Sequence, residues 1–120
     1  MPELDYVRES STTEELMENL CQPVREWFKD RFPDFTDPQK MAIPQIMQGN
    51  HLLLCSPTGS GKTLTAFLTV IDDLVRRSLD GSLKDVVSCI YISPIKALAN
   101  DIQKNLIGPL NEIRESYLPK

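Results

Sequence analysis

One glycine-rich segment in the middle of the chain carries the clearest chemical signal. It runs Ser56-Pro57-Thr58-Gly59-Ser60-Gly61-Lys62-Thr63-Leu64. The segment follows the phosphate-loop pattern G-x-x-x-x-G-K-[ST], with a serine where that pattern has its first glycine. Glycines let the backbone curl so that successive N–H groups point at phosphate oxygens, and the positive end of the following helix adds to this attraction. The lysine supplies charge for the β- and γ-phosphates, and the threonine hydroxyl is placed to ligate Mg²⁺. The segment therefore predicts a site for the phosphates and Mg²⁺ of a nucleotide, but by itself it does not choose between kinases, GTPases, transporters and motors.

Such a loop needs a strand before it and a helix after it. Residues 51–55 form a short apolar run, which predicts a buried strand. Apolar residues then repeat at helical spacing over 64–77, and the β-branched run 86–92 predicts a second buried strand. A last helix is expected over 98–110, broken or kinked at its end by Gly108-Pro109. The order strand–loop–helix–strand–loop–helix predicts an α/β fold with parallel strands and flanking helices.

The residues before the loop predict two further helices. Residues 13–31 read as one amphipathic helix, with Pro23 marking a break or kink, and the residues before it read as a mobile lead-in. A short helix is expected over 39–48, ended by Gly49. Both Trp27 and Phe28 are expected on the packing face of the first of these helices.

The two cysteines, two aspartates and one histidine considered next are expected to have structural roles or to lie at the surface. Cys55 and Cys89 fall in the predicted strands, so both are expected in the core. The run Val70-Ile71-Asp72-Asp73 looks like a strand ending in carboxylates, but it lies inside the helix that must follow the loop. Its two aspartates are therefore expected on the solvated face of that helix. The lone histidine, His51, is expected at the surface.

Length and composition limit the classes of protein that remain. The chain has 120 residues, of which 41% are apolar and 25% charged, so it fits one folded domain at most. No apolar run approaches the roughly 20 residues that span a bilayer, so no membrane partner is expected. The N-terminus lacks the features of a secretory signal, and three scattered cysteines do not form a disulfide pattern, which favours a cytoplasmic location. The formal net charge is −4, but residues 1–37 carry ten acids and four bases whereas 38–120 carry seven and nine.

Two other segments narrow the choice among phosphate-loop proteins. Gln39 lies shortly before the first predicted strand, and a glutamine amide can pair with N6 and N7 of adenine. The second segment lies at the carboxyl end of the second predicted strand, where ligands bind in parallel sheets. It runs Ser93-Pro94-Ile95-Lys96-Ala97-Leu98-Ala99-Asn100-Asp101.

In this order and spacing, the three segments resemble the Q motif, motif I and motif Ia of superfamily 2 helicases. More narrowly, residues 32–113 resemble the Lhr-type (large helicase-related) proteins. The resemblance implies a RecA-like domain that binds ATP and Mg²⁺ and holds a single strand of DNA or RNA, with DNA favoured, by its backbone. Lys62 and Thr63 would serve catalysis, Thr63 would hold Mg²⁺, and Gln39 would contact adenine. The implied phosphate contacts of the strand are Ser93, Pro94, Lys96, Ala97 and Leu98.

Hydrolysis needs groups that this sequence does not contain. Relatives of this type carry a Walker B carboxylate in a D-E-x-H segment beyond motif Ia, and their arginine finger lies on a second domain. The resemblance therefore implies that 32–120 form part of a RecA-like domain, truncated before the Walker B strand, with 1–31 as an acidic lead-in and helix. Such a chain would depend on the remainder of the helicase, expose sheet edges and hydrolyse no ATP alone.

Two other readings stay open at this point. One is a different phosphate-loop enzyme, although the sequence has no N-K-x-D segment for guanine and no recognisable acceptor site of a small-molecule kinase. The other is a non-catalytic nucleotide-binding fragment. Nucleotide binding without turnover would fit the second of these, whereas hydrolysis stimulated by nucleic acid would contradict it.

Overall fold

The computed structural model describes residues 5–55, 62–92 and 102–118. In this part of the chain the regular elements are all helical. They are α1 (Thr13–Asn19), α2 (Gln22–Arg31), α3 (Asp37–Met47), α4 (Lys62–Asp80), η1 (Gln103–Ile107) and α6 (Gly108–Ser116). No helix among the described residues is long and apolar enough to cross a membrane.

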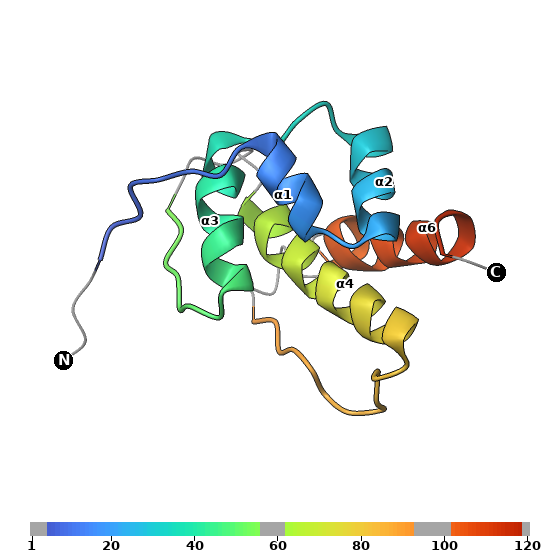
Figure 1. Ribbon diagram of the computed structural model, residues 1–120. Helices are drawn as coiled ribbons and strands as arrows, with labels where there is room; N and C mark the ends of the chain where they lie inside the picture. The colour runs from blue at the N-terminus through green and yellow to red at the C-terminus, as the bar shows by residue number, and fades with distance from the viewer. Residues whose placement is uncertain (1–4, 56–61, 93–101, 119–120) are drawn as a thin grey trace.

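The longest helix, α4, lies at the centre of the molecule. In Figure 1 it runs through the middle, with α3 on one side and α2 and α6 on the other. Its buried face supplies a large share of the core, because its apolar residues recur at the three- and four-residue spacing that places them on one side of a helix. The core cluster comprises Leu16, Leu20, Val24, Trp27, Phe28, Phe35, Ile43, Leu64, Phe67, Leu68, Ile71, Val75 and Ile113. Trp27 and Phe28 thus occupy the predicted packing face.

The helix expected over 13–31 is divided into α1 and α2 close to Pro23, where the sequence predicted a break or kink. Thr12 caps α1 in a capping box with Glu15, and Leu20 and the residue after it are extended. Pro23 occupies the first turn of α2, where a missing N–H costs nothing. In a continuous helix its ring would meet the carbonyl of Asn19, so the proline begins a new helix instead of bending the old one.

The helices on either side of the phosphate loop agree with their predictions in type. Helix α3 covers most of the predicted 39–48 and starts two residues earlier, because Thr36 caps it in a box with Gln39. It ends before Gly49, whose φ of +82° is a conformation that favours glycine. Helix α4 contains the whole of the predicted 64–77 and extends it at both ends.

The two predicted strands are not observed. The described residues contain no strand, and 51–55 and 86–92 have no regular secondary structure. A buried parallel strand needs hydrogen-bonding neighbours along its edges and apolar cover on both faces, and the described residues supply neither here. The α/β class is therefore not confirmed by this structure.

Without a sheet, many apolar side chains of residues 51–55 and 86–92 are left exposed to solvent. The apolar side chains of these segments face solvent, which the sequence did not predict. The large exposed ones are Leu53, Val86, Val87, Ile90 and Ile92. Both Cys55 and Cys89 are exposed as well, so their expected place in the core is wrong for this structure. A contact with the core comes from Tyr91, whose ring centre lies 4.7 Å from that of Phe67.

The last helix changes its winding where the sequence predicted a break. Residues 103–107 form one π-helical stretch, closed by a hydrogen bond from the Gly108 N–H to the Gln103 carbonyl. Pro109 follows, and it can neither donate a hydrogen bond nor tolerate a carbonyl four residues earlier in ordinary α geometry. The wider turn before it accommodates the ring, and α6 then continues to Ser116. The beginning of the predicted helix, 98–101, lies outside the described residues.

Candidate nucleotide-binding site

The predicted phosphate-binding residues are only partly within the described chain. Lys62 is the first residue of α4 and is exposed, Thr63 is half-buried, and Leu64 is buried at 7% exposure. The rest of the predicted loop lies outside the described residues, and so do the five predicted strand contacts. These are Ser56, Pro57, Thr58, Gly59, Ser60 and Gly61, and then Ser93, Pro94, Lys96, Ala97 and Leu98.

The first turn of α4 has the properties that a phosphate site needs. Leu64 joins the core and fixes this end of the helix, while Lys62 stays accessible to solvent. The first N–H groups of a helix lack partners within it, and they lie at the positive end of the helix dipole. An ammonium group beside such N–H groups attracts phosphate oxygens, so the position of Lys62 at the start of α4 is compatible with its predicted role.

A cavity of about 390 Å³ lies against this end of α4. Its size falls in the range of small-molecule sites, and its wall mixes aliphatic side chains with a few polar ones. The lining residues are Ile46, Asn50, His51, Leu52, Leu54, Lys62, Thr65 and Ala66. His51 is exposed, as expected, and the Asn50 side-chain amide donates to Gln45 Oε1 at 2.9 Å.

Gln39, the predicted adenine contact, lies at the other end of α3. Its side-chain Oε1 accepts a hydrogen bond from the Thr36 N–H at 2.8 Å, which makes it part of the capping box of α3. The residue is buried at 3% exposure. It does not appear among the described residues that line the cavity beside Lys62. The structure therefore gives Gln39 a capping role and does not bring it into one cavity with Lys62.

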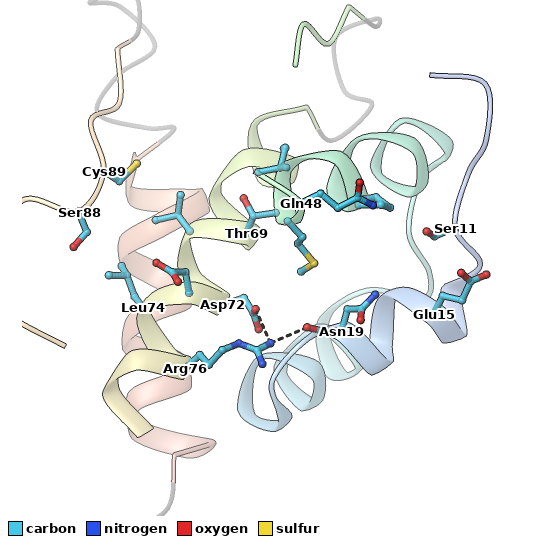
Figure 2. A pocket seen from close by; sticks show the side chains of 15 residues that line it. Ser11, Glu15, Asn19, Gln48, Thr69, Asp72, Leu74, Arg76, Ser88 and Cys89 are labelled. Carbon is cyan, nitrogen blue, oxygen red and sulfur yellow. Dashed lines mark hydrogen bonds and ion pairs between the residues drawn. The ribbon is translucent and has the colours of Figure 1, made fainter. Parts of the chain in front are cut away.

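A polar cluster at the middle of α4 was missed by sequence reasoning. Asp72 is buried at 5% exposure, so its expected place on the solvated face is wrong. Its Oδ1 accepts from the Cys21 N–H at 2.7 Å, and its Oδ2 accepts from Arg76 Nη2 at 3.0 Å. Arg76 Nη2 also donates to the Asn19 carbonyl at 2.8 Å, as Figure 2 shows. By contrast, Asp73 is exposed as expected.

The environment of this cluster raises the pKa values of two of its side chains, Cys21 and Arg76. Burial and the hydrogen bond to Asp72 raise the pKa of Cys21 from about 9 to about 11. The hydrogen bond and the charge of Asp72 also raise the pKa of Arg76. The cluster lies at the edge of a cavity of about 780 Å³ between α1, α3 and α4. The spacing of the sequence could have indicated that Asp72 is buried. Asp72 follows Leu68 by four residues and precedes Val75 by three, so it lies on the apolar face of the helix.

Comparison with known families identifies the class of protein. Residues 36–117 match the family model of the DEAD/DEAH box helicases, so this chain belongs to that family. Membership in this family implies a RecA-like fold. The comparison with solved structures found no match.

Among curated proteins, the chain is similar to several Lhr helicases. It is 47% identical to ATP-dependent helicase Lhr-Core of Methanocaldococcus jannaschii over 94% of the chain, and 54% identical to that of Methanothermobacter thermautotrophicus over 87%. It is 39% identical to the Lhr helicase/uracil glycosylase of Escherichia coli over 83% of the chain. The matches cover 13%, 12% and 7% of the lengths of these relatives, so the chain corresponds to a small part of each.

Proposed function

We propose that this chain supplies the ATP-binding part of a nucleic-acid helicase motor. The observation that supports it best is the start of α4. The helix begins at Lys62, directly after Gly59-Ser60-Gly61, with the lysine exposed and Leu64 anchored in the core. That arrangement suits the phosphates of ATP, and the relatives named above are ATP-dependent helicases.

In this proposal the residues of the site divide the work between them. Lys62 neutralises the β- and γ-phosphates, and the backbone N–H groups of residues 56–61 hold phosphate oxygens. Thr63 contributes its hydroxyl to Mg²⁺, and a hard oxygen donor at the first turn of α4 fits that ion. When bound, the ion offsets the charge that develops on the phosphate oxygens. Gln39 reads the adenine edge, which requires its side chain to leave the capping box seen here.

The strand contact remains a proposal of the same kind. In this proposal five residues hold the phosphates of one nucleic-acid strand: Ser93, Pro94, Lys96, Ala97 and Leu98. Such phosphate contacts do not depend on the base sequence of the strand. We propose DNA as the nucleic acid, because the resemblance to Lhr-type proteins favours DNA over RNA. Comparing the affinities of single-stranded DNA and RNA of equal length tests this choice, and tighter RNA binding would contradict it.

We also propose that these 120 residues do not hydrolyse ATP by themselves. The sequence contains no Asp-Glu-x-His segment, and phosphoryl transfer needs a carboxylate on Mg²⁺ and a group that orients water. ATP hydrolysis by this chain, stimulated by a nucleic-acid strand, would contradict the proposal. Binding without turnover would support it.

The central experiment is Lys62→Ala with ATP affinity as the readout. A charge-assisted contact of roughly 1.5–3 kcal/mol corresponds to a loss of about ten- to 150-fold in affinity. Lys84→Ala is the matched control, because Lys84 is exposed and lies in the segment after α4, away from its first turn. Equal affinities for the Lys62→Ala variant and the unchanged chain would overturn the assignment. Loss of affinity in both variants would indicate a general effect of charge.

A further inference from the structure

We propose that Tyr91 is a positioning residue that holds the predicted strand-binding segment against the phosphate-loop helix, α4. This inference rests on the proposed function, because it takes residues 93–98 as contacts of a nucleic-acid strand and Lys62 as the phosphate contact. The observation that supports it is an aromatic contact between Tyr91 and Phe67 of α4. Tyr91 itself lies outside both predicted binding segments.

The chain between α4 and the predicted strand contacts is held on the molecule at Tyr91. Figure 1 shows it as an orange trace that leaves the end of α4 and forms neither helix nor strand. Every residue from 81 to 92 is exposed except Tyr91, which is half-buried. Its neighbours Ile90 and Ile92 are 79% and 89% exposed. Tyr91 is therefore the residue of 81–92 that packs against the core cluster.

The aromatic contact joins Tyr91 to the helix that begins with Lys62. The ring centres of Tyr91 and Phe67 are 4.7 Å apart and their planes are inclined by 53°. That separation falls in the range of about 4.5–7 Å in which aromatic pairs attract each other. Phe67 is 3% exposed and belongs to the core cluster, so it offers Tyr91 a fixed surface. Phe67 follows Lys62 by five residues, which is a rise of about 7.5 Å along α4.

The predicted strand contacts lie between this anchor and a second one. Ser93 follows Tyr91 by two residues, so their Cα atoms are at most about 7 Å apart. On the other side, Ile102 packs against the core cluster, and the helical stretch η1 that follows it packs against α4. Both described flanks of residues 93–101 are therefore attached close to the phosphate-loop helix.

Loss of the ring contact should weaken strand binding selectively. A segment held at both flanks loses less conformational entropy when it grips phosphates than a segment held at one flank. The energy of an aromatic pair corresponds to about two- to tenfold in affinity. Nucleotide binding should be spared, because the first turn of α4 is anchored in the core by Leu64.

The test measures two affinities of the 120-residue chain, one for a fluorescently labelled oligothymidylate and one for Mg·ATP. Tyr91→Ala should lower the affinity for the oligothymidylate about two- to tenfold and leave the affinity for Mg·ATP within about twofold. Tyr91→Phe keeps the ring and should retain both affinities. Ile90→Ala is the matched control, because Ile90 is the preceding residue of the same segment and is exposed. It should change neither affinity.

Phe67→Leu tests whether Tyr91 acts through Phe67. Leucine keeps an apolar side chain in the core but removes the ring, so Phe67→Leu should weaken strand binding as Tyr91→Ala does. In that background Tyr91→Ala should have no further effect. Direct stacking of Tyr91 on a base of the strand would instead survive Phe67→Leu, and that result would overturn the inference. If Phe67→Leu fails to fold, the variants at Tyr91 and Ile90 decide the outcome.

The other contrary outcomes are equally definite. Unchanged strand affinity in Tyr91→Ala, an equal loss in Tyr91→Phe or Ile90→Ala, or an equal loss of Mg·ATP affinity would each overturn the inference. Failure of the proposed strand contact is distinguishable, because Lys96→Ala would then leave strand affinity unchanged, and the role of Tyr91 would fall with it. If Lys96→Ala weakens strand binding and Tyr91→Ala does not, the strand contact stands and the role of Tyr91 alone is refuted.

Discussion

The contact between α2 and α6 permits a quantitative prediction of stability. Glu112 on α6 accepts a hydrogen bond from the indole Nε1 of Trp27 at 2.7 Å and one from Arg31 at 2.8 Å. These bonds join segments 85 and 81 residues apart in the chain. Glu112→Ala removes both at once, so it tests whether α6 is held against α2 as the structure shows.

The two bonds are expected to contribute unequally. Trp27 is only 2% exposed, so its Nε1–H would lose its partner inside the protein, at a cost of about 1–3 kcal/mol. The Arg31 and Glu112 side chains are 53% and 39% exposed, and ion pairs of that kind contribute roughly 0–1 kcal/mol. We therefore expect Glu112→Ala to lower the free energy of unfolding by about 2 kcal/mol. Glu112→Gln keeps an acceptor for the indole and should cost less than about 1 kcal/mol.

The assay is urea unfolding of the 120-residue chain followed by tryptophan fluorescence. Trp27 is the single tryptophan of the sequence, so the signal reports directly on this contact. Glu115→Ala is the matched control, because Glu115 is exposed on the same helix, and its effect should stay within about 0.5 kcal/mol. If Glu112→Ala and Glu115→Ala unfold at the same urea concentration, the reasoning about the buried indole is refuted.

Two further predictions concern the core and the thiols. Leu68 is fully buried on α4, so Leu68→Ala should lower the free energy of unfolding by about 2–5 kcal/mol. Leu79→Ala is the control and should have a far smaller effect, because Leu79 is 47% exposed on the same helix. Equal urea midpoints for the two variants would contradict this. Iodoacetamide at pH 8 should modify exposed Cys55 and Cys89 well before Cys21. Raising the pKa of Cys21 from about 9 to about 11 lowers its thiolate fraction roughly 100-fold, and the greater nucleophilicity of that thiolate reduces the effect on its rate to about tenfold. The Cys21 rate should rise with pH up to about 11, and a plateau near pH 9 would refute the raised pKa.

The helices before and after the phosphate loop were predictable because their signals are local. The capping residue Thr36, the stop at Gly49 and the apolar spacing of α4 act within a few residues of one another. The break near Pro23 had a local signal too, but its outcome depended on the neighbouring elements. A kink within one helix and a separation into two leave the same proline in the sequence, and Asp72 and Arg76 favour the separation by bonding both exposed helix ends.

The predicted strands show where local reasoning stops. An apolar, β-branched run such as 86–92 favours the strand conformation, but a strand forms only when another segment pairs with its edge. In the described residues that partner is absent, and Val87 and Ile90 face solvent at 82% and 79% exposure. The sequence pattern therefore identifies residues suited to a buried strand, but it does not determine whether another segment pairs with them.

Asp72 shows that residue type can mislead where residue position does not. An aspartate in the interior of a helix is ordinarily solvated, and its neighbour Asp73 behaves in that way. Yet the side chains at 68, 71, 72 and 75 share one face of α4, so a carboxylate at 72 must enter the interior. Burial of that charge is tolerated because it meets a guanidinium and an unsatisfied helix-end N–H there. A buried charge of this kind is costly to leave unpaired, so the partners that it requires also fix how α1 and α2 lie on the phosphate-loop helix.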